Sequence, residues 1–145
     1  MRSAFNEVND WAHSCGSFKR NDQTYVVSVG GLDAIGNGLN STEILISDDE
    51  DDFEDLEWNP GPELPTENCI YGSMLTSPNH DGVILVGCGV QKNNGGTLET
   101  DSIYQLSFDP KGQLQWEKME QKLEFARYGA VAMLVPDESE FVNCN

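Results

Sequence analysis

One stretch decides the fold: Tyr25-Val26-Val27-Ser28-Val29-Gly30-Gly31, which returns later in the chain as Gly82-Val83-Ile84-Leu85-Val86-Gly87-Cys88. Gly30 and Gly87 stand 57 positions apart. Both stretches are mainly apolar and run into glycine, as buried strands that stop at a turn do. The chain therefore repeats itself with a period near 57 residues, and a fixed period is the sequence signature of a repeat architecture.

Each copy of the repeat reads as four short strands with turn residues between them. In the first copy we expect the strands at 12–18, 24–29, 42–46 and 56–59. In the second copy we expect them at 70–76, 82–86, 102–108 and 113–119, with a loop rich in glycine and asparagine at 90–99. No segment has a helical period, so the sequence predicts an all-β protein of four-stranded antiparallel sheets, the unit of a propeller blade.

The repeat also divides the chain. We expect an N-terminal extension (1–11), a first unit (12–65), a second unit (66–124) and the beginning of a third (125–145). Near the ends of the two complete units, Trp58 and Trp116 are 58 positions apart. The tryptophans thus keep nearly the same period as the glycines.

This arrangement resembles the kelch repeat, in which a strand ends in Gly-Gly, the next strand carries an aromatic residue, and a tryptophan lies near the end of the unit. The residues that carry the resemblance are Gly30, Gly31, Trp58, Gly87, Tyr104 and Trp116. The chain departs from the pattern at Leu45, where tyrosine is preferred, and at Cys88, which replaces the second glycine. The resemblance implies kelch-type β-propeller blades, in which the glycines let backbones approach closely and the tryptophans fill the gap between neighbouring blades.

A closed propeller needs about 4–8 blades, and two and a half copies cannot close a ring. We therefore expect an incomplete propeller. The remaining blades come from sequence outside this chain or from several copies assembling, and the first reading, a fragment of a longer protein, is favoured because an open stack exposes sheet faces and edges.

The chain is strongly acidic, with 25 Asp and Glu against 8 Lys and Arg and a formal net charge of −17. Because nucleic acids and anionic membrane surfaces are bound through Lys and Arg, we expect this chain to bind neither. Met1–Glu7 lacks the apolar core of a secretory signal, and no apolar run approaches the roughly 18 residues of a membrane span. Residues 48–55 hold seven acids in eight positions without a glycine, which indicates a solvated loop with a weak preference for a basic partner rather than a calcium loop.

Four cysteines, Cys15, Cys69, Cys88 and Cys144, allow three full pairings. Cys69 opens the first strand of the second unit and Cys88 closes its second strand, so the two lie nearly opposite each other, close to the reach of a disulfide. Buried free thiols are the alternative and the commoner state inside cells. Asn40-Ser41-Thr42 matches the N-glycosylation pattern, so cytoplasmic and secreted locations both stay open.

The sequence offers no catalytic constellation. Its two histidines, His13 and His80, fall in an expected strand and in a turn. No nucleophile elbow, phosphate-binding loop or set of metal ligands accompanies them. We therefore expect a protein that is not an enzyme and that uses no cofactor and no metal.

The kelch resemblance implies a protein partner that docks on the loops between second and third strands and on the connectors between blades. These segments are 32–40, 59–68, 90–99 and 120–126. The candidate partner-binding residues in and beside them are Asp33, Asn37, Asn40, Glu67, Asn68, Gln91, Lys92, Asn93, Asn94 and Arg127. The expected function is a non-catalytic protein-interaction scaffold. Two alternatives stay open: the substrate-recognition part of a ubiquitin-ligase adaptor, and a fragment of a secreted propeller enzyme or carbohydrate-binding protein.

Overall fold

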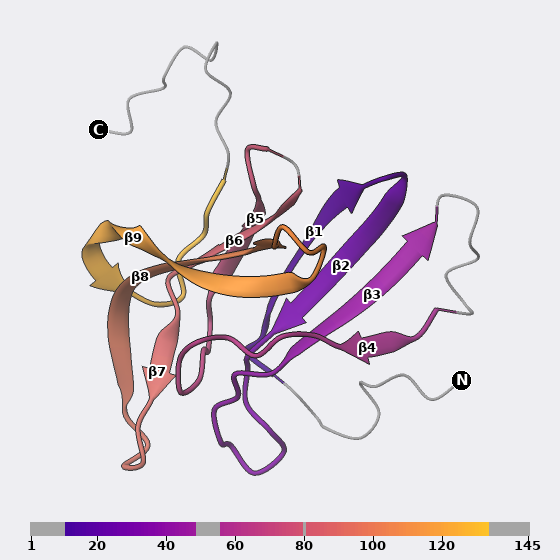
Figure 1. Ribbon diagram of the computed structural model, residues 1–145. Coiled ribbons are helices and arrows are strands. Elements are labelled where there is room, and N and C mark those ends of the chain that lie inside the picture. The colour runs from indigo at the N-terminus through magenta and orange to yellow at the C-terminus, as the bar shows by residue number, and fades with distance from the viewer. Residues whose placement is uncertain (1–10, 49–55, 80, 134–145) are drawn as a thin grey trace.

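The computed structural model describes residues 11–48, 56–79 and 81–133, and all regular structure in these ranges is β (Figure 1). The strands are β1 (Ser14–Arg20), β2 (Gln23–Val29), β3 (Thr42–Asp48), β4 (Trp58–Pro60), β5 (Ser73–Thr76), β6 (Gly82–Val86), β7 (Gly89–Gln91), β8 (Thr97–Phe108) and β9 (Leu114–Arg127). They form two antiparallel sheets, one in the order β1-β2-β3-β4, the other with β5-β6-β8 in sequence and both β7 and β9 paired to β8. The prediction of an all-β protein is confirmed. The predicted acidic loop (from residue 49), His80 and Cys144 lie outside the described residues.

A tight turn sets the ends of the first hairpin. Asn21 and Asp22, between β1 and β2, both have positive φ, 50° and 63°. The type I′ form of a two-residue hairpin turn requires positive φ at both central residues, and Asn and Asp adopt it more readily than other non-glycine residues do. The strand expected at 12–18 therefore runs at Ser14–Arg20 instead, because the turn and not the apolar pattern decides where it stops.

The second sheet follows the expected order with three differences, of which one is that the first strand, expected at 70–76, is β5 at Ser73–Thr76. The segment 90–99, predicted as a loop, is a hairpin in which β7 pairs with the first residues of β8. The prediction was wrong here because an Asn-Gly pair makes a tight turn: Gly95, after Asn94, has φ +81°. In addition, β9 runs on to Arg127, so the expected connector 120–126 belongs to a strand with bulged pairing to β8.

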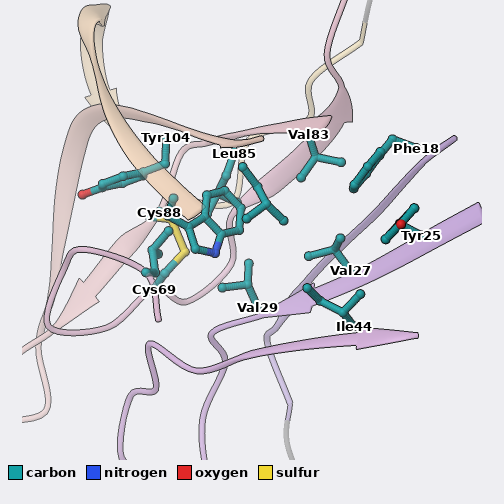
Figure 2. Packing of buried hydrophobic residues seen from close by; sticks show 13 residues of the cluster. Phe18, Tyr25, Val27, Val29, Ile44, Cys69, Val83, Leu85, Cys88 and Tyr104 are labelled. Carbon is teal, nitrogen blue, oxygen red and sulfur yellow. A yellow bond between two sulfur atoms is a disulfide. The ribbon is translucent and has the colours of Figure 1, made fainter. Parts of the chain in front are cut away.

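The core lies between the two sheets (Figure 2). Side chains of a strand alternate between its two faces, so each sheet supplies every second residue of its central strands. The first sheet contributes Phe18, Tyr25, Val27, Val29 and Ile44, and the second contributes Val83, Leu85, Tyr104, Leu106 and Trp116. Leu64, Cys69 and Cys88 close this core from the connecting segments.

The two tryptophans occupy matching strands but have different surroundings. Trp116 on β9 is 8% exposed, and its indole Nε1 donates a hydrogen bond of 2.9 Å to the Thr42 hydroxyl of the first sheet. Trp58 on β4 pairs with Leu45, the neighbour of the core residue Ile44. Because neighbours point to opposite faces, Trp58 faces away from the second sheet. Trp116 thus fills the gap between the two sheets, whereas Trp58 does not.

Gly30 and Gly31 lie where the main chain of the second unit contacts the first unit. Gly30 and Gly31 have φ of +69° and +96°, and the Gly31 amide donates to the Cys69 carbonyl at 2.7 Å. A Cβ on Gly30 would collide with that same carbonyl. Gly87, the matching residue of the second unit, also has a positive φ of +68°. The glycines are therefore required both by the close approach and by the left-handed backbone.

Candidate functional site

Three segments meet at one end of the two sheets: the loop after β2, the connector before β5, and the β7–β8 hairpin (Figure 1). We call this end the loop face and define it by residues 31–40, 61–70 and 89–97. Main-chain hydrogen bonds fasten the first two segments together, since the Cys69 amide donates to the Leu39 carbonyl and the Leu64 amide donates to the Asn40 carbonyl, both at 2.9 Å. The loop face is therefore built from two successive units of the repeat.

A disulfide joins the connector to the segment that follows β6. Cys69 and Cys88 are bonded, with a Cα–Cα distance of 5.0 Å, and their side chains are 0% and 1% exposed. The sequence had placed this pair opposite each other across a hairpin, and in the structure the bridge closes just beyond the paired ends of β5 and β6. Cys15 is a free thiol. The bridge fixes the connector against the base of the β7–β8 hairpin.

An asparagine clamps the hairpin to the connector. Asn68 is buried, and its side-chain amide makes two hydrogen bonds with the main chain of Gln91: Oδ1 accepts from the amide at 2.7 Å and Nδ2 donates to the carbonyl at 3.1 Å. The side chain of Gln91 in turn donates to the Gly36 carbonyl at 2.7 Å. Asn68 thus pairs with Gln91, a residue of β7, as a neighbouring strand would, and the clamp reaches all three segments of the loop face.

Two cavities open beside this clamp. The larger, of about 730 Å³, is lined by Thr66, Glu67, Val90, Lys92, Asn93, Asn94 and Leu98. The smaller, of about 400 Å³, is lined by Gly36, Asn37, Gly38, Asn68, Gln91, Lys92, Asn93 and Gly95. Lys92 and Asn93 belong to both, so the two cavities are neighbours along one surface. Their volumes fall within the roughly 300–1,000 Å³ that is usual for ligand sites.

Seven of the ten predicted partner-binding residues line these cavities: Asn37, Glu67, Asn68, Gln91, Lys92, Asn93 and Asn94. Four of the seven have a structural role as well: Asn68 and Gln91 form the clamp, the Asn37 side chain donates to Asp33, and the Asn94 side chain accepts from the Gly96 amide. The side chains left to meet a ligand are one amide, one ammonium and one carboxylate. This set can donate and accept hydrogen bonds along a polar, extended ligand.

Three predicted residues do not line either cavity. Arg127 ends β9, and its Nε donates to the Phe125 carbonyl at 3.3 Å. Asn40 is half-buried in the loop after β2. In its glycosylation triplet, the hydroxyl of Thr42 is buried and accepts the hydrogen bond from Trp116. The third, Asp33, makes hydrogen bonds within its own loop.

Sequence reasoning missed the apolar part of the larger cavity. Val90 and Leu98 face each other across the β7–β8 ladder, and both line that cavity together with Thr66. The sequence carried a signal for this pair, because an Asn-Gly turn flanked by apolar residues predicts a hairpin. Had 90–99 been interpreted as a hairpin, Val90 and Leu98 would have been expected on one face.

Asp33 shapes the loop after β2. Its carboxylate accepts hydrogen bonds from the main-chain amides of Ile35 at 3.0 Å and Asn37 at 2.8 Å, and from the Asn37 side chain at 3.0 Å. These bonds, those from Asn37 first, lower the pKa of Asp33 below its ordinary value of 3.8. The charged carboxylate therefore organises the loop and is not free to bind a partner.

We predict an acid-sensitive loop around Asp33. A carboxyl group whose pKa is lower in the folded chain stabilises the fold at pH values above the ordinary one, and loses that effect as the pH falls through the folded-state pKa. NMR titration should give a midpoint for the Asp33 carboxyl below 3.8, with the amide signals of Ile35 and Asn37 moving in step. In an Asp33→Asn variant those amides should not titrate in this range. A midpoint at or above the ordinary value would contradict the prediction.

Comparison with known proteins adds no further assignment: the sequence matches no model of a protein family and no curated protein. Within residues 11–48, 56–79 and 81–133, no three His, Cys, Asp or Glu side chains gather as metal ligands would. No helix long and apolar enough to cross a membrane occurs in the described part of the chain.

Proposed function

We propose that this chain is part of a kelch-type β-propeller that binds a protein partner through the loop face and carries out no catalysis. The observation that carries the proposal is the pair of adjoining cavities, which loops from two successive repeats build and which the Asn68 clamp and the disulfide hold in place. Loops on a rigid β scaffold are where binding residues concentrate. Asparagine side chains suit a peptide because each offers one donor group and one acceptor, as a peptide bond does.

The stacking of the two sheets supports the propeller part of the proposal. Trp116 of the second sheet packs onto the first sheet with the core residues Val83 and Leu106. In the first sheet, Val26, Leu45 and Trp58 stand at the matching positions of the ladder, and they lie on the face that the second sheet does not cover. All three are partly exposed. A further blade, packed as the second sheet packs on the first, would bury them.

The beginning of the third copy supports the same arrangement on the other side. The amide of Ala132 donates to the Ser73 hydroxyl on β5 at 2.9 Å, and Ala130 lies beside Gly87 at the end of β6. The strand β5 of the second sheet lies beside β1 of the first sheet in a comparable way, and its Thr76 hydroxyl donates to the Ser17 carbonyl at 2.8 Å. Each copy thus starts against the inner strands of the copy before it, as consecutive propeller blades do.

The test of partner binding uses the tip of the β7–β8 hairpin. A variant with Lys92 and Asn93 changed to alanine should lose at least one protein that the unchanged chain captures from cell extract, while its melting temperature stays the same, because these side chains are exposed. The matched control changes Lys111 and Gln113, exposed residues of the turn between β8 and β9, and should keep the captured protein. A photo-crosslinker placed at Asn93 should attach to the same protein. Equal capture by both variants, or a loss explained by a lower melting temperature, would overturn the proposal.

A further inference from the structure

Three exposed aromatic side chains form a row beside the loop face. Trp11, Tyr71 and Tyr128 are 53%, 40% and 45% exposed, and each stands near the beginning of a different copy of the repeat. The ring centroids of Trp11 and Tyr71 are 6.4 Å apart at an interplanar angle of 74°, and those of Tyr71 and Tyr128 are 6.4 Å apart at 35°. We call these three residues the aromatic row. Its rings stand at angles to one another and do not stack into a closed core.

The main chain sets the spacing of the aromatic row. The Tyr71 amide donates to the Ala12 carbonyl at 2.8 Å, and the Gly129 amide donates to the Tyr71 carbonyl at 2.9 Å. The same hydrogen bond thus links each copy of the repeat to the next. The rings attached to this ladder are held at a regular distance by backbone geometry, which preorganises them for a ligand.

Tyr71 occupies a backbone conformation that side chains disfavour. Its φ is 56°, and the matching residue of the next copy is Gly129 with φ 67°. Glycine adopts this left-handed conformation readily, whereas a residue with a large side chain is strained there. Ala12, which takes the same place in the first copy, has a φ of 62° as well. The left-handed conformation therefore belongs to this position of the repeat, and at Tyr71 it comes with a large side chain that glycine would not have.

The aromatic row lies beside segments that form the loop face. Trp11 forms a bridge with Leu32 at the start of the loop after β2, and the Cβ of Tyr128 lies 3.2 Å from where a Cβ on Gly89 would stand. Glu99 pairs with Gly89 across the β7–β8 ladder, so an acidic residue lies one strand away from Tyr128.

We propose that the aromatic row binds arginine and lysine side chains of a basic peptide segment in the protein partner. This inference rests on the proposed function and names the chemistry of its partner. Faces of Trp and Tyr rings attract cations that lie within about 6 Å of the ring centroid, and the net charge of −17 draws a basic segment towards the chain. Among the described residues, Phe108 makes a cation–π contact within the chain, with its ring centroid 3.7 Å from the Arg20 guanidinium carbon. No such contact with a described residue involves the three rings of the row.

The proposal is tested with a fluorescein-labelled peptide of alternating arginine and glycine, titrated with the whole chain and followed by fluorescence anisotropy. We expect measurable binding, and roughly threefold to tenfold weaker binding when Trp11, Tyr71 or Tyr128 is changed to alanine. Phe125→Ala, which removes an aromatic side chain that is 63% exposed outside the row, should leave the affinity unchanged. A peptide with citrulline in place of arginine has a similar shape but no charge and should bind at least tenfold more weakly.

A Tyr71→Gly variant separates binding from folding. Glycine suits the positive φ at this position, so the melting temperature should stay the same or rise, while the affinity should fall as far as in Tyr71→Ala. The proposal is overturned by absent binding of the arginine peptide, by equal binding of the citrulline peptide, or by variants of the row that bind as tightly as the unchanged chain. It is also overturned if sedimentation shows a dimer that Tyr71→Ala dissolves, because a second copy then covers the row. Loss of the captured partner in the hairpin variant but in none of the row variants would reject this inference and leave the proposed function standing.

Discussion

Changing Trp116 to alanine is expected to lower the free energy of unfolding by about 3–5 kcal/mol, the usual range for removing a large aromatic side chain from a core. The indole lies between the two sheets and is 8% exposed. Its removal leaves a cavity and also takes away the hydrogen-bond donor of the buried Thr42 hydroxyl. Since Thr42 and Trp116 belong to different sheets, this one side chain contributes both apolar contact and a polar link to the stacking of the two units.

Trp58→Ala is the matched control, because it removes the same side chain from the equivalent strand of the first sheet. Trp58 faces away from the core between the sheets and is partly exposed, so its loss should cost clearly less than the loss of Trp116. Trp116→Phe should fall between the two, since phenylalanine keeps most of the apolar contact and loses the hydrogen bond. Urea unfolding followed by circular dichroism gives all three values. Equal destabilisation by Trp58→Ala and Trp116→Ala would show that the two sheets are not stacked through Trp116.

The part of the fold that could be predicted from sequence is the part fixed by local pattern. The strand Gly82–Val86 was predicted with its observed bounds, because a short apolar run between a turn and a glycine leaves little choice of position. The all-β class followed from eight such segments in two copies. The length of β9 could not be predicted, because β9 continues only as long as β8 offers it a partner. Pairing between distant segments decides this, and in residues 120–126 the alternating Leu123 and Phe125 are too short a pattern to fix where the strand ends.

The sequence predicted which loops form the candidate site but not what each side chain in them does. Asn68 and Asp33 look alike in the sequence, as polar residues in loops. In the structure the Asn68 side chain hydrogen-bonds the Gln91 main chain, and the Asp33 carboxylate hydrogen-bonds the amides of its own loop. The aromatic row was missed for another reason. The bridges Trp11–Leu32 and Ile70–Gly89 make Ile70, not Tyr71, the counterpart of Trp11. The rings are therefore neighbours in space without standing at one period of the repeat.

Removing the disulfide is expected to lower the free energy of unfolding by about 3 kcal/mol. Cys69 and Cys88 are 19 positions apart, and closing a loop of this size reduces the entropy of the unfolded chain by roughly that amount at 25 °C. A variant with both cysteines changed to alanine keeps two small apolar side chains in the core and avoids leaving a lone thiol. Urea unfolding of this variant should show its midpoint at a lower concentration, with little change in slope.

The same variant tests how the loop face is held together. Cys69 follows Asn68 in sequence, and Cys88 comes just before β7, so the bridge and the clamp fasten the same two segments. Without the bridge, the amide of Gln91 should exchange its hydrogen faster, because the connector and the hairpin are then joined by the clamp and by the Ile70–Gly89 main-chain hydrogen bonds, without a covalent link. Cys15→Ser, which changes the free thiol on β1, is the control and should alter neither the midpoint nor this exchange rate. An unchanged midpoint for the double variant would mean that the connector is positioned by packing and hydrogen bonds alone.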